Sequence, residues 1–113
     1  MSCNCNCNIT INAGGTAYIS NTQVTVGTEA VDIALGWRRI PSIGRFIVRM
    51  ENAIPSDATT TLPITLTLNG ITKPLNLPNG DAVTVADVTG VVVMDILYDK
   101  WNNILALLSR TTV

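Results

Sequence analysis

Apolar and polar residues alternate with a period of two along most of the chain, the pattern of half-buried β-strands. No segment keeps the 3.6-residue period of a helix, although residues 82–88 fit either a strand or one helical turn. The pattern therefore predicts an all-β protein. The predicted strands cover residues 8–12, 17–20, 23–26, 30–35, 45–50, 62–68, 71–77, 91–98 and 101–108.

Turn residues separate these strands. Asn21-Thr22 predicts a tight turn between two strands, and Asn69-Gly70 favours a type I′ hairpin because both central residues need positive φ. Pro74 indicates an edge strand, since proline cannot donate to a ladder. Further turns are predicted at residues 78–81 and at Asp99-Lys100. Roughly seven to nine short strands with regular turns predict an antiparallel β-sandwich or partly closed barrel, jelly-roll or immunoglobulin-like.

A chain of 113 residues fits one domain. We expect a single β-domain over residues 1–113, in which residues 1–8 form an N-terminal arm of alternating Cys and Asn. The arm has neither a positive nor an apolar region of the kind that forms a secretory signal, which predicts synthesis in a cytoplasm. Apolar runs stay below the ~18 residues of a membrane span, so no membrane partner is expected.

The composition is poor in charge. Hydrophobic residues make up 47% of the chain and charged residues 13%, against roughly 25% charged in typical soluble domains. Such a chain leaves an apolar or neutral-polar surface, which favours contacts with partner proteins. The alternative is a compact β-domain with a threonine-rich surface. A net charge of −1 provides no broad basic field for nucleic acid.

The sequence contains few residues that could catalyse a reaction. The chain has no histidine, which removes the histidine-based triads and the commonest metal ligand. A glycosidase-like carboxylate pair is conceivable, but most acids lie at turns or alternate with apolar residues. No glycine-rich segment has the lysine of a phosphate-binding loop. We therefore predict no enzyme activity, no cofactor and no catalytic or metal-binding residues, and an enzyme remains a third hypothesis.

Three cysteines alternate near the start. In an extended chain Cys3, Cys5 and Cys7 share one face at a spacing of roughly 6.5–7 Å. That spacing strains a disulfide two residues apart and differs from the C-x-x-C spacing of zinc sites. The thiols are therefore small buried side chains, candidate intersubunit disulfides, or ligands for a soft metal across a symmetry axis.

Charge is segregated along the chain. Arg38, Arg39, Arg45 and Arg49 fall within twelve residues, whereas residues 50–99 contain six acids against Lys73 alone. One hypothesis is an interface in which this arginine strip meets an acidic surface of another subunit. The other is pairing with acids of the same sheet, since the planar guanidinium binds carboxylates in bidentate fashion either way.

Aromatic residues are scarce, and the two tryptophans are the candidates for binding. Trp37 precedes two arginines, and Trp101 lies in or beside a predicted turn. Each is a candidate core residue or interface anchor. Together they are also a candidate platform for a sugar, which would make the chain a small binding module for glycans or a cell-surface ligand.

Several features together resemble small structural proteins of tailed bacteriophage heads, especially those of crAss-like phages. These are the Met-Ser start, the Thr/Val/Asn-rich strands, the strand Arg45-Phe46-Ile47-Val48-Arg49, and the segment Asp95-Ile96-Leu97-Tyr98-Asp99-Lys100-Trp101-Asn102-Asn103-Ile104-Leu105. The resemblance implies a capsid decoration, auxiliary or fibre-anchoring subunit located in the virion. It implies self-association and binding to the major capsid or other head proteins, and it supplies no catalytic residues.

Overall fold

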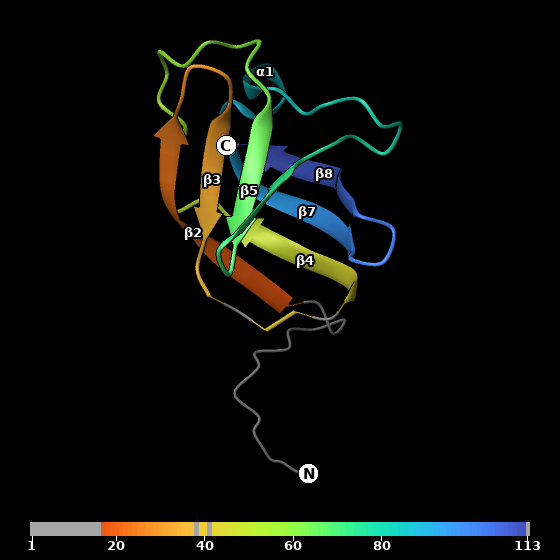
Figure 1. Ribbon diagram of the computed structural model, residues 1–113. Coiled ribbons are helices and arrows are strands. Elements are labelled where there is room, and N and C mark those ends of the chain that lie inside the picture. Colours follow the sequence, from red (N-terminus) through yellow and green to blue (C-terminus); the bar gives the residue numbers. More distant parts are fainter. Residues whose placement is uncertain (1–16, 38, 41, 113) are drawn as a thin grey trace.

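The computed structural model describes residues 17–37, 39–40 and 42–112 (Figure 1). The N-terminal arm, the predicted strand 8–12, Cys3, Cys5, Cys7 and Arg38 lie outside the described residues. In chain order the elements are β2 (Ala17–Val26), β3 (Val31–Leu35), β4 (Ile43–Arg49), β5 (Ile64–Leu68), β6 (Ile71–Pro74), α1 (Val85–Val88), β7 (Val91–Asp99) and β8 (Ile104–Thr112).

The seven described strands form one mixed sheet in the order β6-β5-β3-β2-β4-β7-β8. The sheet is curled into a half-barrel: in Figure 1, β2, β3 and β5 stand upright, whereas β4, β7 and β8 cross behind them at an angle. The all-β prediction is confirmed. The strictly antiparallel arrangement is wrong, because β2 pairs with β4 and β3 pairs with β5 in parallel, and two packed sheets of a sandwich are not confirmed.

The parallel pairs follow from where each connection starts. β3 is antiparallel to β2 and returns the chain to the end at which β2 begins. The connection 36–42 leads into β4, which starts beside the start of β2 and runs in the same direction. The loop 50–63 leads from β4 into β5 at the other end, beside the start of β3.

The core fills the inside of the curl. Burial alternates along β3, where Val31, Ile33 and Leu35 are buried, and along β4, where Phe46 and Val48 are buried. The predicted period of two therefore matches the inner and outer faces of the sheet. The single turn of α1, one of the two forms expected for residues 82–88, adds Val85 and Val88 to this core.

The predicted tight turn at Asn21-Thr22 is wrong, because β2 continues through these residues with an irregular register between Asn21 and Gln23. Residues 17–20 pair with β4, and residues 21–26 pair with β3. β2 therefore changes partner at Asn21, whose side chain is only 2% exposed. The Asn21 Oδ1 accepts the backbone N–H of Asn52 at 2.9 Å, and the Asn21 Nδ2 donates to the Asn52 carbonyl at 2.7 Å.

These two bonds explain why a polar residue is buried at the bend. They occupy both polar atoms of the Asn21 amide, and Asn52 Nδ2 also donates to the Asn21 carbonyl at 3.2 Å. The contact ties β2 to the segment after β4, beyond the last paired residue of β4. A buried amide with this pairing avoids the penalty of an unsatisfied group.

Turn chemistry in the second half matches most of the predictions. Asn69 and Gly70 have φ of 52° and 84°, as a type I′ hairpin requires. Pro74 lies on β6, the terminal strand of the sheet, as predicted. The strand predicted from Trp101 is wrong at its start, because residues 100–103 form a turn and β8 begins at Ile104.

The strand predicted to reach residue 77 ends at Pro74, and the following segment closes the half-barrel on one side. Asn76 donates its N–H to the Leu105 carbonyl at 3.0 Å and accepts the N–H of Leu107 at 2.8 Å. Leu75, which is fully buried, donates instead to the Ile64 carbonyl of β5. Residues 75–77 therefore bridge the two ends of the curled sheet.

We predict that Asn21→Leu lowers the free energy of unfolding by about 2 kcal/mol, because it leaves the backbone N–H and carbonyl of Asn52 unpaired. The matched control is Asn52→Ala, which removes a single side-chain bond and should cost about 1 kcal/mol or less. Urea denaturation monitored by circular dichroism measures both. Equal losses in the two variants would show that the Asn21 amide does not hold the bend.

Candidate functional site

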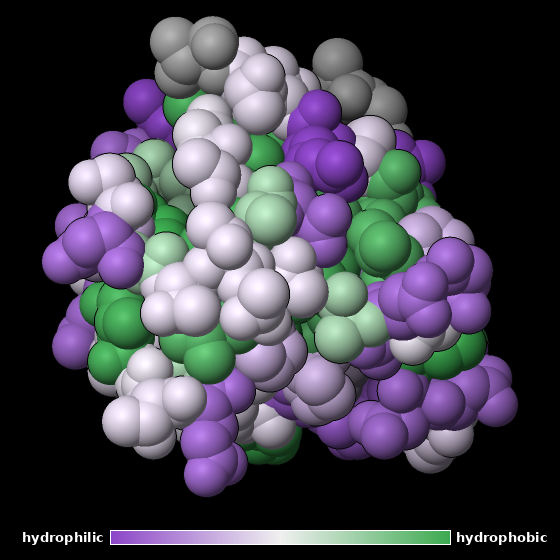
Figure 2. All heavy atoms as spheres, turned by 90° about the horizontal axis from the view of Figure 1, so that it is seen from above, coloured by the Kyte–Doolittle hydropathy of each residue, from purple (hydrophilic) through white to green (hydrophobic). Residues whose placement is uncertain are grey.

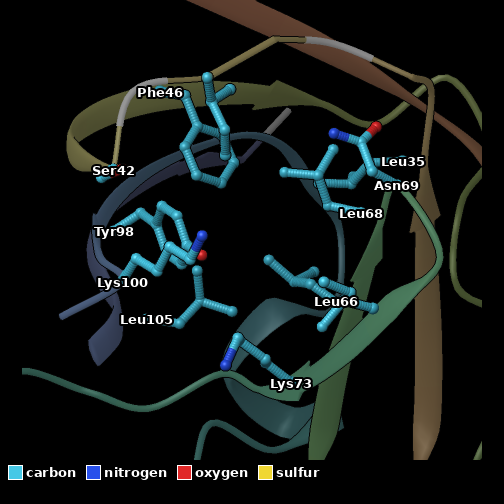
Figure 3. A pocket seen from close by; sticks show the side chains of 12 residues that line it. Leu35, Ser42, Phe46, Leu66, Leu68, Asn69, Lys73, Tyr98, Lys100 and Leu105 are labelled. Carbon is cyan, nitrogen blue, oxygen red and sulfur yellow. The ribbon is translucent and has the colours of Figure 1, made fainter. Parts of the chain in front are cut away.

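A cavity of about 180 Å³ opens at one end of the half-barrel (Figure 3). Apolar side chains make most of its wall, and four polar residues complete it. The apolar residues are Leu35, Ile40, Phe46, Leu66, Leu68, Ile71, Tyr98 and Leu105, and the polar residues are Ser42, Asn69, Lys73 and Lys100. Sequence reasoning missed this site, because its residues come from seven separate segments that only the sheet order brings together.

The strand directions explain why these segments meet. β3 and β5 are parallel and end together, while β4 and β8 begin where β7 ends. The antiparallel pairing of β2 with β3 and the parallel pairing of β2 with β4 place all these strand ends at the same end of the half-barrel. Figure 3 shows Leu35, Leu68 and Asn69 on one side of the space and Tyr98, Lys100 and Leu105 on the other.

The wall of the cavity is positively charged. Lys73 donates to Asn103 Oδ1 at 2.7 Å. Among the described residues, no hydrogen bond or ion pair holds the ammonium of Lys100. None of the described residues that line the cavity is acidic. Two ammonium groups therefore accompany an apolar interior, and no carboxylate of the wall neutralises them.

The β7–β8 turn fixes the position of Lys100. Asp99 Oδ1 accepts the backbone N–H of Trp101 at 3.0 Å and of Asn102 at 3.2 Å, and Asp99 Oδ2 accepts Asn102 Nδ2 at 2.8 Å. The Lys100 N–H donates to the Ser42 carbonyl at 2.7 Å. The side-chain bond from Asn102, followed by the two backbone bonds, lowers the pKa of Asp99 from its usual 3.8.

Both tryptophans are exposed, which excludes the alternative that they are core residues. Trp37 is 77% exposed and Trp101 is 74% exposed. Trp37 follows the lining residue Leu35 by two positions, and Trp101 follows the lining residue Lys100 directly. The two indoles therefore lie at the cavity end of the protein.

Three exposed isoleucines lie at or directly beside lining residues of the cavity. Ile71 lines the cavity, Ile43 follows the lining residue Ser42, and Ile104 precedes the lining residue Leu105. Ile43 on β4 and Ile104 on β8 both pair with Asp99 of β7, which lies between them. We use the name apolar rim for Trp37, Ile43, Ile71, Trp101 and Ile104. These are five of the eight exposed large hydrophobic residues in the described part of the chain.

The described arginines of the predicted strip are exposed. Arg45 and Arg49 pair with acids of the same chain: Arg45 binds Asp95 on β7 in bidentate fashion, with Nε–Oδ1 of 3.2 Å and Nη2–Oδ2 of 2.7 Å. This hydrogen-bonded carboxylate raises the pKa of Arg45 above its usual value. The Arg49 Nε lies 3.0 Å from Glu51 Oε1. Pairing with an acid of the same sheet, one of the two hypotheses, therefore holds for Arg45, whereas Arg49 pairs with Glu51 just beyond the end of β4. The interface hypothesis stays a prediction.

A polar cluster on the outer face of β3, β5 and β6 was not anticipated. Asp32 Oδ1 accepts the hydroxyls of Thr65 at 2.7 Å and Thr67 at 2.8 Å. Thr67 in turn lies 2.6 Å from the Thr72 hydroxyl. The parallel register of Asp32 opposite Thr65 creates this cluster. The carboxylate of Asp32 is thereby engaged in cross-strand hydrogen bonds that stabilise the sheet.

The opposite end of the molecule combines neutral polar side chains with acidic ones, because Glu29, Glu51 and Asp57 are exposed there. Figure 2 views the end that carries the β2–β3 turn, the loop 50–63 and α1, and side chains of intermediate hydropathy cover its middle. Exposed threonines are common in these segments, among them Thr28, Thr59, Thr60, Thr61 and Thr89. The cavity and the exposed tryptophans single out the cavity end as the candidate site.

Within the described residues, no group of three or more acidic or thiol side chains is placed to hold a metal ion. The same part of the chain contains no helix with the length and apolar character needed to cross a membrane. Comparisons with protein-family models, curated proteins and solved structures give no match for this chain.

We predict that acid loosens the β7–β8 turn before the rest of the sheet. Because folding lowers the pKa of Asp99 below 3.8, the carboxylate stabilises the turn above that pH, and this contribution is lost as pH falls through the lower folded value. The amide signals of Trp101 and Asn102 in NMR spectra should shift over this range. Asp99→Asn should remove the shift and Asp57→Asn, in the loop 50–63, should preserve it; an unchanged shift in Asp99→Asn contradicts the assignment.

Proposed function

We propose that the protein is a non-enzymatic structural subunit of a bacteriophage virion that acts through contacts with its own copies and with other head proteins. The apolar rim carries the proposal. Five exposed large hydrophobic residues lie at strand ends and turns of the cavity end, and one of them, Ile71, lines the cavity itself. Surfaces of this kind mark protein contacts, in which buried aromatic anchors contribute most of the affinity.

The distribution of charge supports the same proposal. The chain has seven basic and eight acidic residues, and Arg45–Asp95 and Arg49–Glu51 neutralise four of these within the chain. Charged residues make up only 13% of the chain, and a surface with so few ions costs less to desolvate when a partner covers it. Such a protein binds by covering neutral and apolar area, as a capsid decoration, auxiliary or fibre-anchoring subunit would.

The contact surface is tested by replacing part of the apolar rim. We expect the purified protein to self-associate or to co-sediment with phage capsids, and the double variant Ile43→Thr/Trp101→Ser to weaken this association roughly tenfold or more, because it removes two anchors. Analytical ultracentrifugation over a range of concentrations measures the effect.

The matched control is Val26→Thr/Leu108→Thr, which removes two exposed hydrophobic side chains away from the rim. This control should associate like the unmodified protein. A protein that stays monomeric at all concentrations and ignores capsids would overturn the proposal. An equal loss of association in both double variants would show that the contact does not depend on the apolar rim.

The second candidate function is glycan binding, favoured by the exposure of both indoles at the cavity end. Flat aromatic faces bind sugar rings by stacking, so a bound glycan should quench tryptophan fluorescence. We expect Trp37→Ala and Trp101→Ala each to lower the affinity at least several-fold if both indoles stack on the sugar. The absence of quenching by a panel of bacterial surface glycans would remove this candidate.

A further inference from the structure

We infer that the cavity binds a small carboxylic acid with an apolar tail, with the tail inside and the carboxylate between Lys100 and Lys73. This inference does not depend on the assembly role proposed above. It follows from three properties of the same site: its size, the chemistry of its wall, and the charge at its margin.

The size of the cavity sets the size of the tail. A dry apolar cavity of about 150 Å³ accepts one benzene molecule, and the present cavity measures about 180 Å³. It therefore has room for one phenyl ring or a short alkyl chain, and a long acyl chain does not fit. Phe46, Leu66 and Leu105, from three different strands, are buried at this wall and supply apolar contacts.

The charge at the margin selects an anion. Among the described residues, Lys100 and Lys73 are the two charged residues that line the wall. The Lys73 ammonium has one neutral acceptor, Asn103, and no described residue binds the Lys100 ammonium. Figure 3 shows the Lys100 side chain reaching toward the space that the apolar residues enclose. A carboxylate placed there gains two cationic partners, whereas an ammonium ligand meets like charge.

The backbone holds the Lys100 side of the site in place before any ligand arrives. The Lys100 N–H donates to the Ser42 carbonyl, and the Asp99 carboxylate accepts the backbone N–H groups of Trp101 and Asn102. The carboxylate of Asp99 is therefore engaged by the turn and does not line the cavity. A turn that is already formed reduces the ordering cost of binding.

The test uses three probes of one shape and different charge: 3-phenylpropionate, 3-phenylpropan-1-ol and 3-phenylpropylamine. NMR titration of the full chain should show saturable shifts at cavity residues with a dissociation constant on the order of millimolar for the acid. The alcohol should bind roughly fivefold more weakly, because it lacks the two partly exposed charge contacts, and the amine more weakly still.

Three variants separate the contributions. Lys73→Gln/Lys100→Gln should abolish the preference for the acid over the alcohol, whereas Arg110→Gln, which removes an exposed cation that does not line the cavity, should keep it. Ile71→Trp places a large side chain at a lining position that is 60% exposed, so it should block all three probes without unfolding the sheet. A thermal melt confirms that each variant is folded.

Equal affinities of the acid and the alcohol for the unmodified protein would overturn the inference, as would shifts that map outside the cavity or fail to saturate. Retention of the acid preference in the double lysine variant would also overturn it. These outcomes are independent of assembly, because Ile43→Thr/Trp101→Ser changes no lining residue. Loss of self-association with intact probe binding, or the reverse, tells the two proposals apart.

Discussion

The buried amide of Asn21 is the contact on which the shape of this protein depends. β2 belongs to both halves of the curled sheet, and it passes from one to the other where Asn21 bonds the backbone of Asn52. A flat sheet of seven strands has no interior. Because β2 changes partner at this residue, the two halves face each other, and the core and the cavity lie between them.

Local patterns in the sequence were sufficient to predict most of the strands and some of the turns. Alternation identified β3 and β7 closely, and Asn69-Gly70 identified its hairpin, because these signals depend on neighbouring residues alone. Asn21 and Thr22 are turn-forming residues, but they lie within β2. Asn21 bonds Asn52, which is 31 positions away along the chain, so no local pattern indicates this contact. Trp101 fits the alternation of a strand, yet the side chain of Asp99 holds it in a turn.

The candidate site was less predictable than the strands for a related reason. Trp37 and Trp101 were identified from residue type, but the cavity between their chain segments depends on the strand order, which no local pattern encodes. Lys73 and Lys100 lie 27 positions apart and line one cavity only because β6 and the turn after β7 both contribute to one end of the half-barrel. Parallel pairing of β3 with β5 was the missing information.

The closure between residues 75–77 and β8 has a consequence for how the interior is reached. Only two backbone hydrogen bonds, both through Asn76, join this segment to β8, whereas neighbouring strands such as β4 and β7 are joined along seven paired residues. Local opening follows the least-bonded contacts. Opening the contact between residues 75–77 and β8 therefore breaks only these two backbone hydrogen bonds and leaves every pairing between the described strands intact.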